Sequence, residues 1–446
     1  MTIDRKEKAL TEEYLVELLT DDSICRNEYL RAFLEILNDI EHGLSIFIDG
    51  KWGSGKTIFV KQAMLSLQVL CGTYKDVIEE KTQHCIGTAL EEFEPKFTYL
   101  PLYYNAWEND IYDNPMVTLL GSLISTPDTK SFGELSPDTE EKVSKIVDGL
   151  LNMVKLEGVS IIREGFTSKD LLKSMKEVQS LQDKIKELID YLLDGRADKL
   201  VLFIDELDRC SPAFALRLLE QIKFMFSLDN VIVVFSTNMS QLAHTVQGFY
   251  GPDFNGHEYL TRYFDLKLEL NAVEPSDFLK IHGLSETNDF YNRIALEVAN
   301  SFSFQMRDCL RYLEEIKRIG WINKGLSSFS GRAANLIFVG LAPVIMAVKI
   351  RDHDLYEKIT SGSAATELFD LASKSTSFTR WLEKCSYQAD QEIRHGEAKF
   401  KTPVNYYQAV YKEAFDNIKD RVSDQAKTDL HFWGNKHDLR TTLLGF

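Results

Sequence analysis

One glycine-rich stretch constrains the fold of this chain more than any other feature of its sequence. Residues 46–57 are IFIDGKWGSGKT and residues 58–65 are IFVKQAML, so an apolar run, a GxxxxGK[ST] pattern and a helix-forming run follow one another. This order is typical of a phosphate-binding P-loop, in which glycines let several backbone N–H groups converge on one anion at a helix N-terminus. The residues expected to hold the phosphates of a nucleotide are Gly50, Lys51, Trp52, Gly53, Ser54, Gly55, Lys56 and Thr57.

The last two residues of this pattern have side chains with separate predicted roles. Lys56 is expected to reach the β- and γ-phosphates and so to take part in catalysis, and the Thr57 hydroxyl is expected to ligate Mg²⁺. The expected cofactors are therefore ATP and Mg²⁺.

A second apolar run ends in acidic residues. Residues 199–204, KLVLFI, precede DELDRC, and a continuous apolar run of this length predicts a central parallel strand buried on both faces. Open α/β sheets bind ligands at the C-terminal ends of such strands. We expect Asp205 to hold Mg²⁺ through water and Glu206 to orient and deprotonate the attacking water. An acidic pair often marks only a strand end, and the P-loop in the same domain favours a Walker B motif here.

Three further polar residues are candidates for contacts with the phosphates. Asn238 follows the apolar run at residues 231–235 and either touches the γ-phosphate or the attacking water, or caps the strand end. Arg262 precedes the strand expected at residues 266–270, on the nucleotide-proximal side, where it either stabilises transition-state charge in a neighbouring subunit or is a solvated surface arginine. Arg307 opens a C-terminal helix and is a candidate second sensor of the phosphates.

A further aromatic strand is expected at residues 97–104, FTYLPLYY. The plainest interpretation of the tail that follows it, NAWEND, is a core tryptophan, Trp107, followed by a turn.

Hydrophobic periodicity predicts an α/β fold in which a P-loop core with a parallel sheet precedes an all-helical region. Residues 11–40 have apolar residues at helical spacing, split near residues 21–23, and residues 168–193 have the pattern of one long amphipathic helix. Residues 125–141 are polar and are expected to form an exposed loop. The expected parts are N-terminal helices (1–40), the core (41–272) with a helical insert at about 125–198, and a helical C-terminal region (273–446) with helices at 302–319, 333–350, 355–371 and 406–418.

Composition excludes several other classes of protein. The formal net charge of −17 argues against a broad nucleic-acid-binding surface, because neutralising phosphates needs clustered lysine and arginine. The N-terminus lacks an apolar secretion signal and the 6 cysteines form no CxxC pair, so we expect a cytoplasmic protein without a zinc site. The apolar residues 333–350 contain Asn335 and Pro343 and are expected to form a buried helix and not a membrane span.

Four separated motifs resemble those of the KAP family of P-loop NTPases, within the signal-transduction ATPases, and they occur in the family's order. The resemblance covers about residues 15–320. Residues 24–27, ICRN, also resemble the family's N-terminal segment, which lies near the base of the bound nucleotide. The four motifs are DGKWGSGKT (49–57), YYNAWEND (103–110), FIDELDRCSP (203–212) and YLTRYFD (259–265).

The chain departs from the family's pattern at two of the candidate site residues. Glu206 stands where the family commonly has Asp, which favours a competent base, and Asn238 stands where an acidic residue is common, which leaves its role open. The membrane spans that many members carry between Walker A and Walker B are absent from this sequence. The resemblance implies a role in anti-phage defence or a related multi-protein system, acting with co-encoded effector proteins.

Three functions follow as hypotheses. The leading one is an ATP-hydrolysing conformational switch whose helical C-terminal half passes the nucleotide state to a partner, with a homo-oligomer expected if Arg262 acts between subunits. The alternatives are a nucleotide-gated scaffold that does not hydrolyse ATP, against which Glu206 argues, and a P-loop small-molecule kinase, which the DELDR strand end fits poorly.

Overall fold

The computed structural model divides the chain into two compact units, Met1–Ala272 and Val273–Phe446, each of which is described by itself. The residues that it describes are 11–71, 78–91, 93–112, 114–125, 145, 183–225, 228–270, 272–285, 289–325, 331–392, 400–415 and 423–430.

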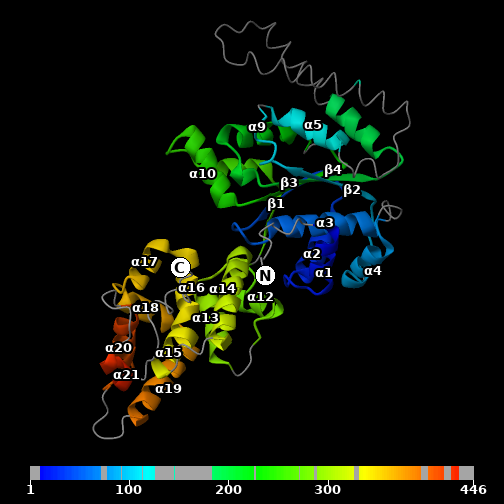
Figure 1. Cartoon of the computed structure of the whole chain (residues 1–446). Helices are drawn as coiled ribbons and strands as arrows, with labels where there is room; N and C mark the ends of the chain where they lie inside the picture. The colour runs from blue at the N-terminus through cyan, green and yellow to red at the C-terminus, as the bar shows by residue number, and fades with distance from the viewer. Residues whose placement is uncertain are drawn as a thin grey trace. The chain divides into compact units, whose positions relative to one another are not determined.

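The first unit is built on a five-stranded parallel sheet with the strand order β2-β3-β4-β1-β5 (Figure 1). All seven residues of β3 and all seven of β4 are buried, which is the burial predicted from the apolar run of β3. The predicted α/β core with a parallel sheet is therefore confirmed. The strands are β1 (Leu44–Asp49), β2 (Tyr99–Asn105), β3 (Lys199–Asp205), β4 (Val231–Thr237) and β5 (Leu266–Glu269).

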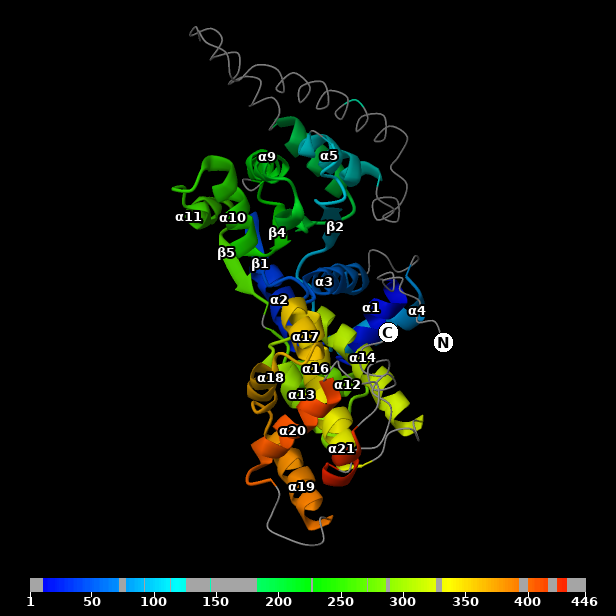
Figure 2. The same ribbon diagram turned by 60° about the vertical axis from the view of Figure 1, so that its left-hand side comes forward.

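Helices cover both faces of this sheet (Figures 1 and 2). Successive residues of a strand face opposite sides, so Ile46 and Ile48 belong to one apolar cluster and Phe47 to the other. One face is covered by α1 (Glu12–Thr20), α2 (Asn27–Asp39), α3 (Lys56–Leu70) and α4 (Glu80–Ala89). The other is covered by α5 (Pro115–Ser125), the helical residues 183–193, α9 (Pro212–Ile222) and α10 (Met239–Tyr250).

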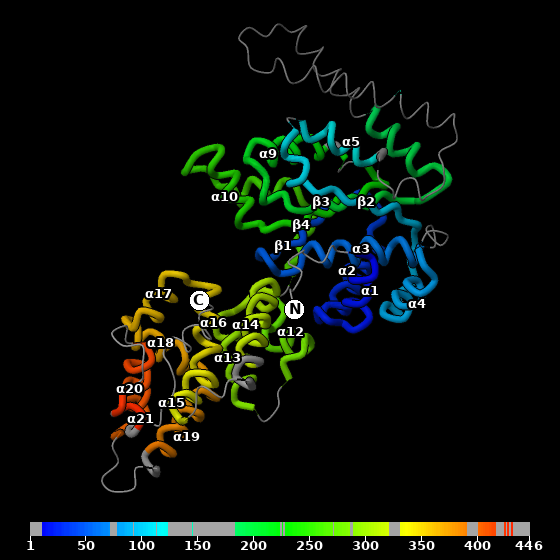
Figure 3. The backbone as a smooth tube through the Cα atoms, viewed as in Figure 1, coloured from blue at the N-terminus to red at the C-terminus, as the bar shows by residue number. Residues whose placement is uncertain are grey.

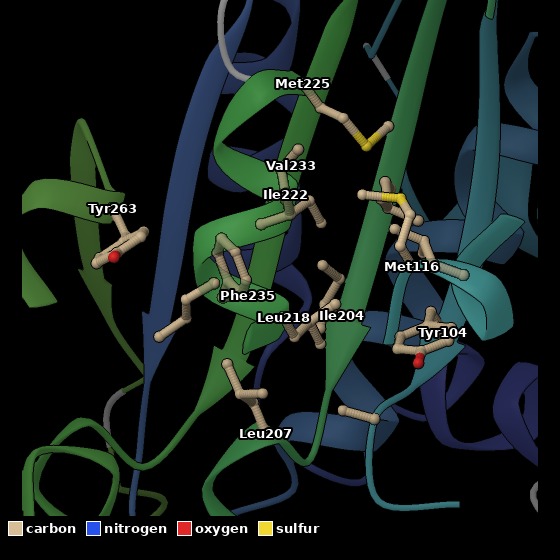
Figure 4. Close-up of a cluster of buried hydrophobic side chains, with 14 of the residues drawn as sticks. Tyr104, Met116, Ile204, Leu207, Leu218, Ile222, Met225, Val233, Phe235 and Tyr263 are labelled. Carbon is tan, nitrogen blue, oxygen red and sulfur yellow. The ribbon is translucent and has the colours of Figure 1, made fainter. Parts of the chain in front are cut away.

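The second of these clusters is shown in Figure 4, where Ile204 and Phe235 of the sheet face Leu218 of α9 and Met116 of α5. Short helical segments complete the unit. They are η1 (Leu207–Arg209), η2 (Lys223–Met225), α11 (Gly256–Leu260) and η3 (Thr261–Tyr263).

The described residues of the second unit contain helices and no strand, which confirms the predicted helical C-terminal region (Figure 3). The helix predicted at residues 355–371 is instead two helices, because Gly362 with φ 83° ends the first of them. The helices are α12 (Pro275–Ile281), α13 (Phe290–Ser301), α14 (Met306–Gly325), α15 (Arg332–Asn335), the π-helical η4 (Leu336–Leu341), α16 (Ala342–Arg351), α17 (His353–Thr360), α18 (Ala365–Ala372), α19 (Thr376–Glu392), α20 (Pro403–Phe415) and α21 (Asp424–Asp429).

The elements α15, η4 and α16 follow one another without a break and form the apolar helical segment Arg332–Arg351, which in the described part of the chain is the one segment long and apolar enough to cross a membrane. Its most apolar stretch is 78% buried inside the structure, as in the core helix of a folded domain. The Pro343 carbonyl accepts a hydrogen bond from the Tyr312 hydroxyl at 3.1 Å, and the Asn335 carbonyl accepts one from the Trp381 indole at 3.2 Å. These contacts support the predicted buried helix.

Three predicted elements lie partly outside the described residues. They are the polar loop at residues 125–141, apart from its first residue, residues 416–418 of the helix at residues 406–418, and the first part of the helix at residues 168–193. The last part of that helix, residues 183–193, is helical and buries Leu188, Ile189 and Leu192 against the sheet, as its periodicity predicts.

Candidate functional site

The glycine-rich loop connects the end of β1 to the start of α3. Gly53 (φ 80°) and Gly55 (φ 86°) have the left-handed backbone conformation that other residues rarely adopt, and Gly55 immediately precedes the first residue of α3. The loop therefore turns sharply into a helix N-terminus, whose N–H groups and positive dipole end favour an anion.

Lys56, the first residue of α3, is buried and turns back onto its own loop. Its Nζ donates to the Gly50 carbonyl at 2.8 Å and to the Lys51 carbonyl at 3.3 Å. Burial lowers the pKa of Lys56, and the carboxylates of Asp208, Asp205 and Asp49 oppose that shift, so acidic groups that end or follow β1 and β3 lie near this ammonium group.

The strand order brings these acidic groups to the loop, because β4 lies between β1 and β3. The Gly50 N–H donates to the Thr237 carbonyl at 3.2 Å, and the Glu206 N–H donates to the Ser236 carbonyl at 3.3 Å. The end of β4 thus holds the P-loop on one side and the acidic segment on the other.

Asp205 is 1% exposed, and both of its oxygens accept hydrogen bonds. Oδ1 accepts from the Glu206 N–H at 2.9 Å and Oδ2 accepts from the Tyr103 hydroxyl of β2 at 3.1 Å. Burial, and then the Asp205 carboxylate, raise the pKa of Tyr103, so its hydroxyl stays protonated as the donor. Asp205 is therefore held as a buried acceptor.

Glu206 has φ 61°, in the left-handed region that a glutamate seldom adopts. Its Oε1 forms an ion pair with Arg209 Nη2 at 2.9 Å, and the Arg209 guanidinium lies over the Trp107 ring, 5.6 Å from its centroid. A strained backbone of this kind is found most often at functional sites.

Asp208 links the acidic segment to both other parts of the site. It is 7% exposed, its Oδ2 accepts from the Trp52 indole N–H of the P-loop, and its Oδ1 accepts from the Thr237 hydroxyl at 3.1 Å. Asp208 therefore joins the loop to the ends of β3 and β4.

Two hydroxyl groups at this edge remain without a partner. Ser54 Oγ of the loop and Ser236 Oγ of β4 are buried and have no hydrogen bond within the described part of the chain. A buried polar atom usually has a hydrogen-bond partner, so these two hydroxyl groups fit a polar ligand.

The hydroxyl oxygen of Thr57 and the carboxylate oxygens of Asp205 are the kind of ligand atoms that Mg²⁺ prefers.

Comparison with known proteins agrees with this geometry. Residues 26–323, about two thirds of the chain, match the KAP family P-loop domain. The chain belongs to this family. A shorter similarity, 51% identity over 53 residues, links it to an uncharacterized protein of Methanocaldococcus jannaschii, and covers 12% of this chain and 27% of that protein. Membership of the KAP family makes this chain a nucleotide-binding NTPase of the P-loop class.

Four of the predicted site residues of this KAP-family chain meet at one edge of the sheet. Lys56 and Thr57 begin α3, and Asp205 and Glu206 lie at the end of β3. Asn238 lies at the same edge, where its side chain caps α10 by accepting from the Gln241 N–H at 3.3 Å.

The prediction that Arg262 lies on the nucleotide-proximal side is wrong. β5 runs parallel to β1 and begins at Leu266, opposite Ile46, so Arg262 lies at the edge where the strands begin. The residues expected to bind the phosphates follow the opposite ends of the strands, and Arg262 is exposed. An Arg262 that reaches a phosphate therefore has to do so in another subunit.

The two remaining assignments concern Arg307 and Trp107. Arg307 is exposed on α14 of the second unit, and its role as a sensor stays a prediction. The interpretation of Trp107 as a core residue is wrong, because its side chain is 51% exposed beside Arg209.

Sequence reasoning missed four residues that build the site. Tyr103, Asp208 and Arg209 stand in the motifs YYNAWEND and DELDRC, and Thr237 stands in the strand end before Asn238. The motifs contain these residues, but the side chains that contact them lie on other strands or at other strand ends. Those contacts could be found only from the strand order.

Gly50 offers a direct test of the loop. A Cβ at this position would lie 2.8 Å from Ser54 Oγ and 3.3 Å from Lys56 Cγ, so Gly50→Ala has to displace both side chains. We expect the affinity for a non-hydrolysable ATP analogue, measured by calorimetry, to fall by about tenfold or more. Gly248→Ala in α10 is the matched control, because a Cβ there meets nothing within 4 Å. Equal affinities of the two variants would contradict the assignment of the loop.

Proposed function

We propose that this KAP-family chain binds ATP together with Mg²⁺ and hydrolyses it to ADP and phosphate. The observation that carries the proposal is the convergence of three strand ends, which bring the Lys56 ammonium group near the Asp205 carboxylate and place Glu206, immediately after Asp205, at the same edge of the sheet. A phosphate clamp, a metal ligand and a base are the parts that phosphoanhydride hydrolysis needs.

Each residue then has one task in the reaction. The loop N–H groups and Lys56 hold the β- and γ-phosphates, and Glu206 accepts a proton from the attacking water. The water oxygen bonds to the γ-phosphorus, the bond from that phosphorus to the β–γ bridging oxygen breaks, and ADP leaves with that oxygen. A Mg²⁺ ion held by Thr57 and, through water, by Asp205 would neutralise charge that develops on the phosphates.

One observation favours a second candidate function, a nucleotide-binding scaffold that does not hydrolyse ATP. In the structure the Glu206 carboxylate is engaged by Arg209 at 2.9 Å, and a base that stayed in this ion pair would be a poor proton acceptor. The position of a glutamate immediately after Asp205 supports hydrolysis, and a turnover assay separates the two functions.

Two further parts of the proposal are a conformational switch and a role in anti-phage defence. The family match continues to residue 323, which lies in the second unit, and this supports a switch in which helices of that unit respond to the nucleotide. A part in anti-phage defence with co-encoded effector proteins rests on the resemblance of the motifs alone.

Glu206→Gln tests the assignment of the base. Glutamine keeps the shape of the side chain but cannot take a proton, so we expect ATP binding to persist and kcat to fall by about 10²–10⁴-fold. Turnover is measured as phosphate release and affinity by calorimetry, with Glu314→Gln, an exposed residue of α14, as the control. Unchanged turnover in Glu206→Gln would show that another group is the base, and wild-type binding without turnover would favour the scaffold.

Arg262 tests whether active sites are shared between subunits. An arginine supplied in trans is worth about 10³–10⁵ in rate, so Arg262→Ala and Lys56→Ala proteins should each be nearly inactive. When the two are mixed and subunits exchange, some interfaces combine an intact loop with an intact arginine, and we expect part of the phosphate release to return. Normal turnover in Arg262→Ala, or no recovery despite demonstrated exchange, would make Arg262 a surface residue.

A further inference from the structure

Arg209 is a cation beside the proposed reaction centre to which the roles above give no task. It ends η1, the short helical turn that follows Glu206, and its side chain is 30% exposed while that of Glu206 is 15% exposed. The guanidinium is therefore fixed enough to make a defined ion pair, at 2.9 Å, and open enough to reach a ligand.

A second contact of this guanidinium is with an aromatic ring. Trp107, from the tail that follows β2, lies under it with 5.6 Å between the guanidinium carbon and the ring centroid. The tail is itself held in place, because the Asp110 carboxylate accepts from the Ser211 N–H at 2.9 Å and from the Ser211 hydroxyl at 2.7 Å. A planar cation held on an aromatic ring is suited to bidentate contact with a phosphate.

Arg209 also lies close enough to Lys56 for their charges to repel. Burial lowers the pKa of Lys56 most, three carboxylates oppose that shift, and the positive charge of Arg209 lowers this pKa further. The charge of Arg209 is therefore felt at Lys56, so both cations border the same site, where each can meet a phosphate group.

The position of the base decides which phosphate Arg209 can meet. Water attacks the γ-phosphorus in line with the leaving oxygen, so the base lies beyond the terminal phosphate and away from the β-phosphate. A cation in contact with the base at 2.9 Å is therefore at the γ-phosphate end of the site.

We infer that Arg209 is a γ-phosphate sensor, which exchanges its ion pair with Glu206 for contact with the terminal phosphate and thereby frees Glu206 to act on water. This inference rests on the proposed function, and it makes the release of the base depend on ATP and not on ADP. It also explains why the structure shows Glu206 in an ion pair with Arg209. Without ATP this pair keeps the base inactive, as in the scaffold, and with ATP the base is released, as hydrolysis requires.

The test compares affinities for a non-hydrolysable ATP analogue and for ADP, each with Mg²⁺, by calorimetry on the full chain. We expect Arg209→Ala to lower affinity for the ATP analogue by about tenfold to a hundredfold, and to change affinity for ADP by less than about threefold. Arg209→Lys should recover part of the loss. Glu206→Gln should bind the ATP analogue several-fold more tightly than the wild type, because Arg209 then has no carboxylate to leave. Arg311→Ala, an exposed residue of α14, is the control.

The outcomes separate the inference from the proposed function. A wild-type protein that binds neither nucleotide would overturn the proposed function itself. A wild-type protein that binds both, with Arg209→Ala losing affinity for both equally or for neither, would overturn the sensor and leave Arg209 as a residue that only positions Glu206. A fall in turnover without a change in the ratio of the two affinities would do the same.

Discussion

The insertion of β4 between β1 and β3 is the constraint on which the rest of the site depends. Its last two residues accept hydrogen bonds from both sides, Ser236 from the Glu206 N–H and Thr237 from the Gly50 N–H. This strand therefore supports both the glycine-rich loop and the acidic segment, which the hydrogen bond between Trp52 and Asp208 also joins directly. Because parallel strands end at the same edge of a sheet, three segments that are far apart in the sequence meet there.

Charge balance is the second organising feature of this edge. In the structure three cations at this edge contact groups of the protein itself, and two of them form ion pairs, Lys267 with Asp49 at 3.0 Å and Arg209 with Glu206 at 2.9 Å. Lys56 likewise donates to carbonyls of its own loop. A bound triphosphate would compete for these cations, so its arrival has to rearrange the contacts of the acidic residues. The proposed release of Glu206 on ATP binding depends on this competition.

The sequence predicted the parts of the fold that depend on local chemistry. The glycine pattern identified the loop, and the continuous apolar run before Asp205 identified a strand buried on both faces. Strand order and register could not be predicted, because they depend on contacts between distant segments. For that reason the partners of Asp208 and Arg209 were missed, and Arg262 was assigned to the wrong edge although its place before a strand was correct. The exposure of Trp107 was missed for the same reason, since its neighbour Arg209 comes from another strand end.

The central claim is that one sheet edge binds the phosphates of ATP through the loop and Lys56. Calorimetric titration of the wild type, of Lys56→Ala and of Lys186→Ala with an ATP analogue and Mg²⁺ tests it most directly, since Lys186 is exposed on the helical residues 183–193. We expect the wild type and Lys186→Ala to bind with the same affinity, and Lys56→Ala, which lacks the buried cation, to lose affinity by about tenfold or more. Equal affinity of all three proteins would contradict it.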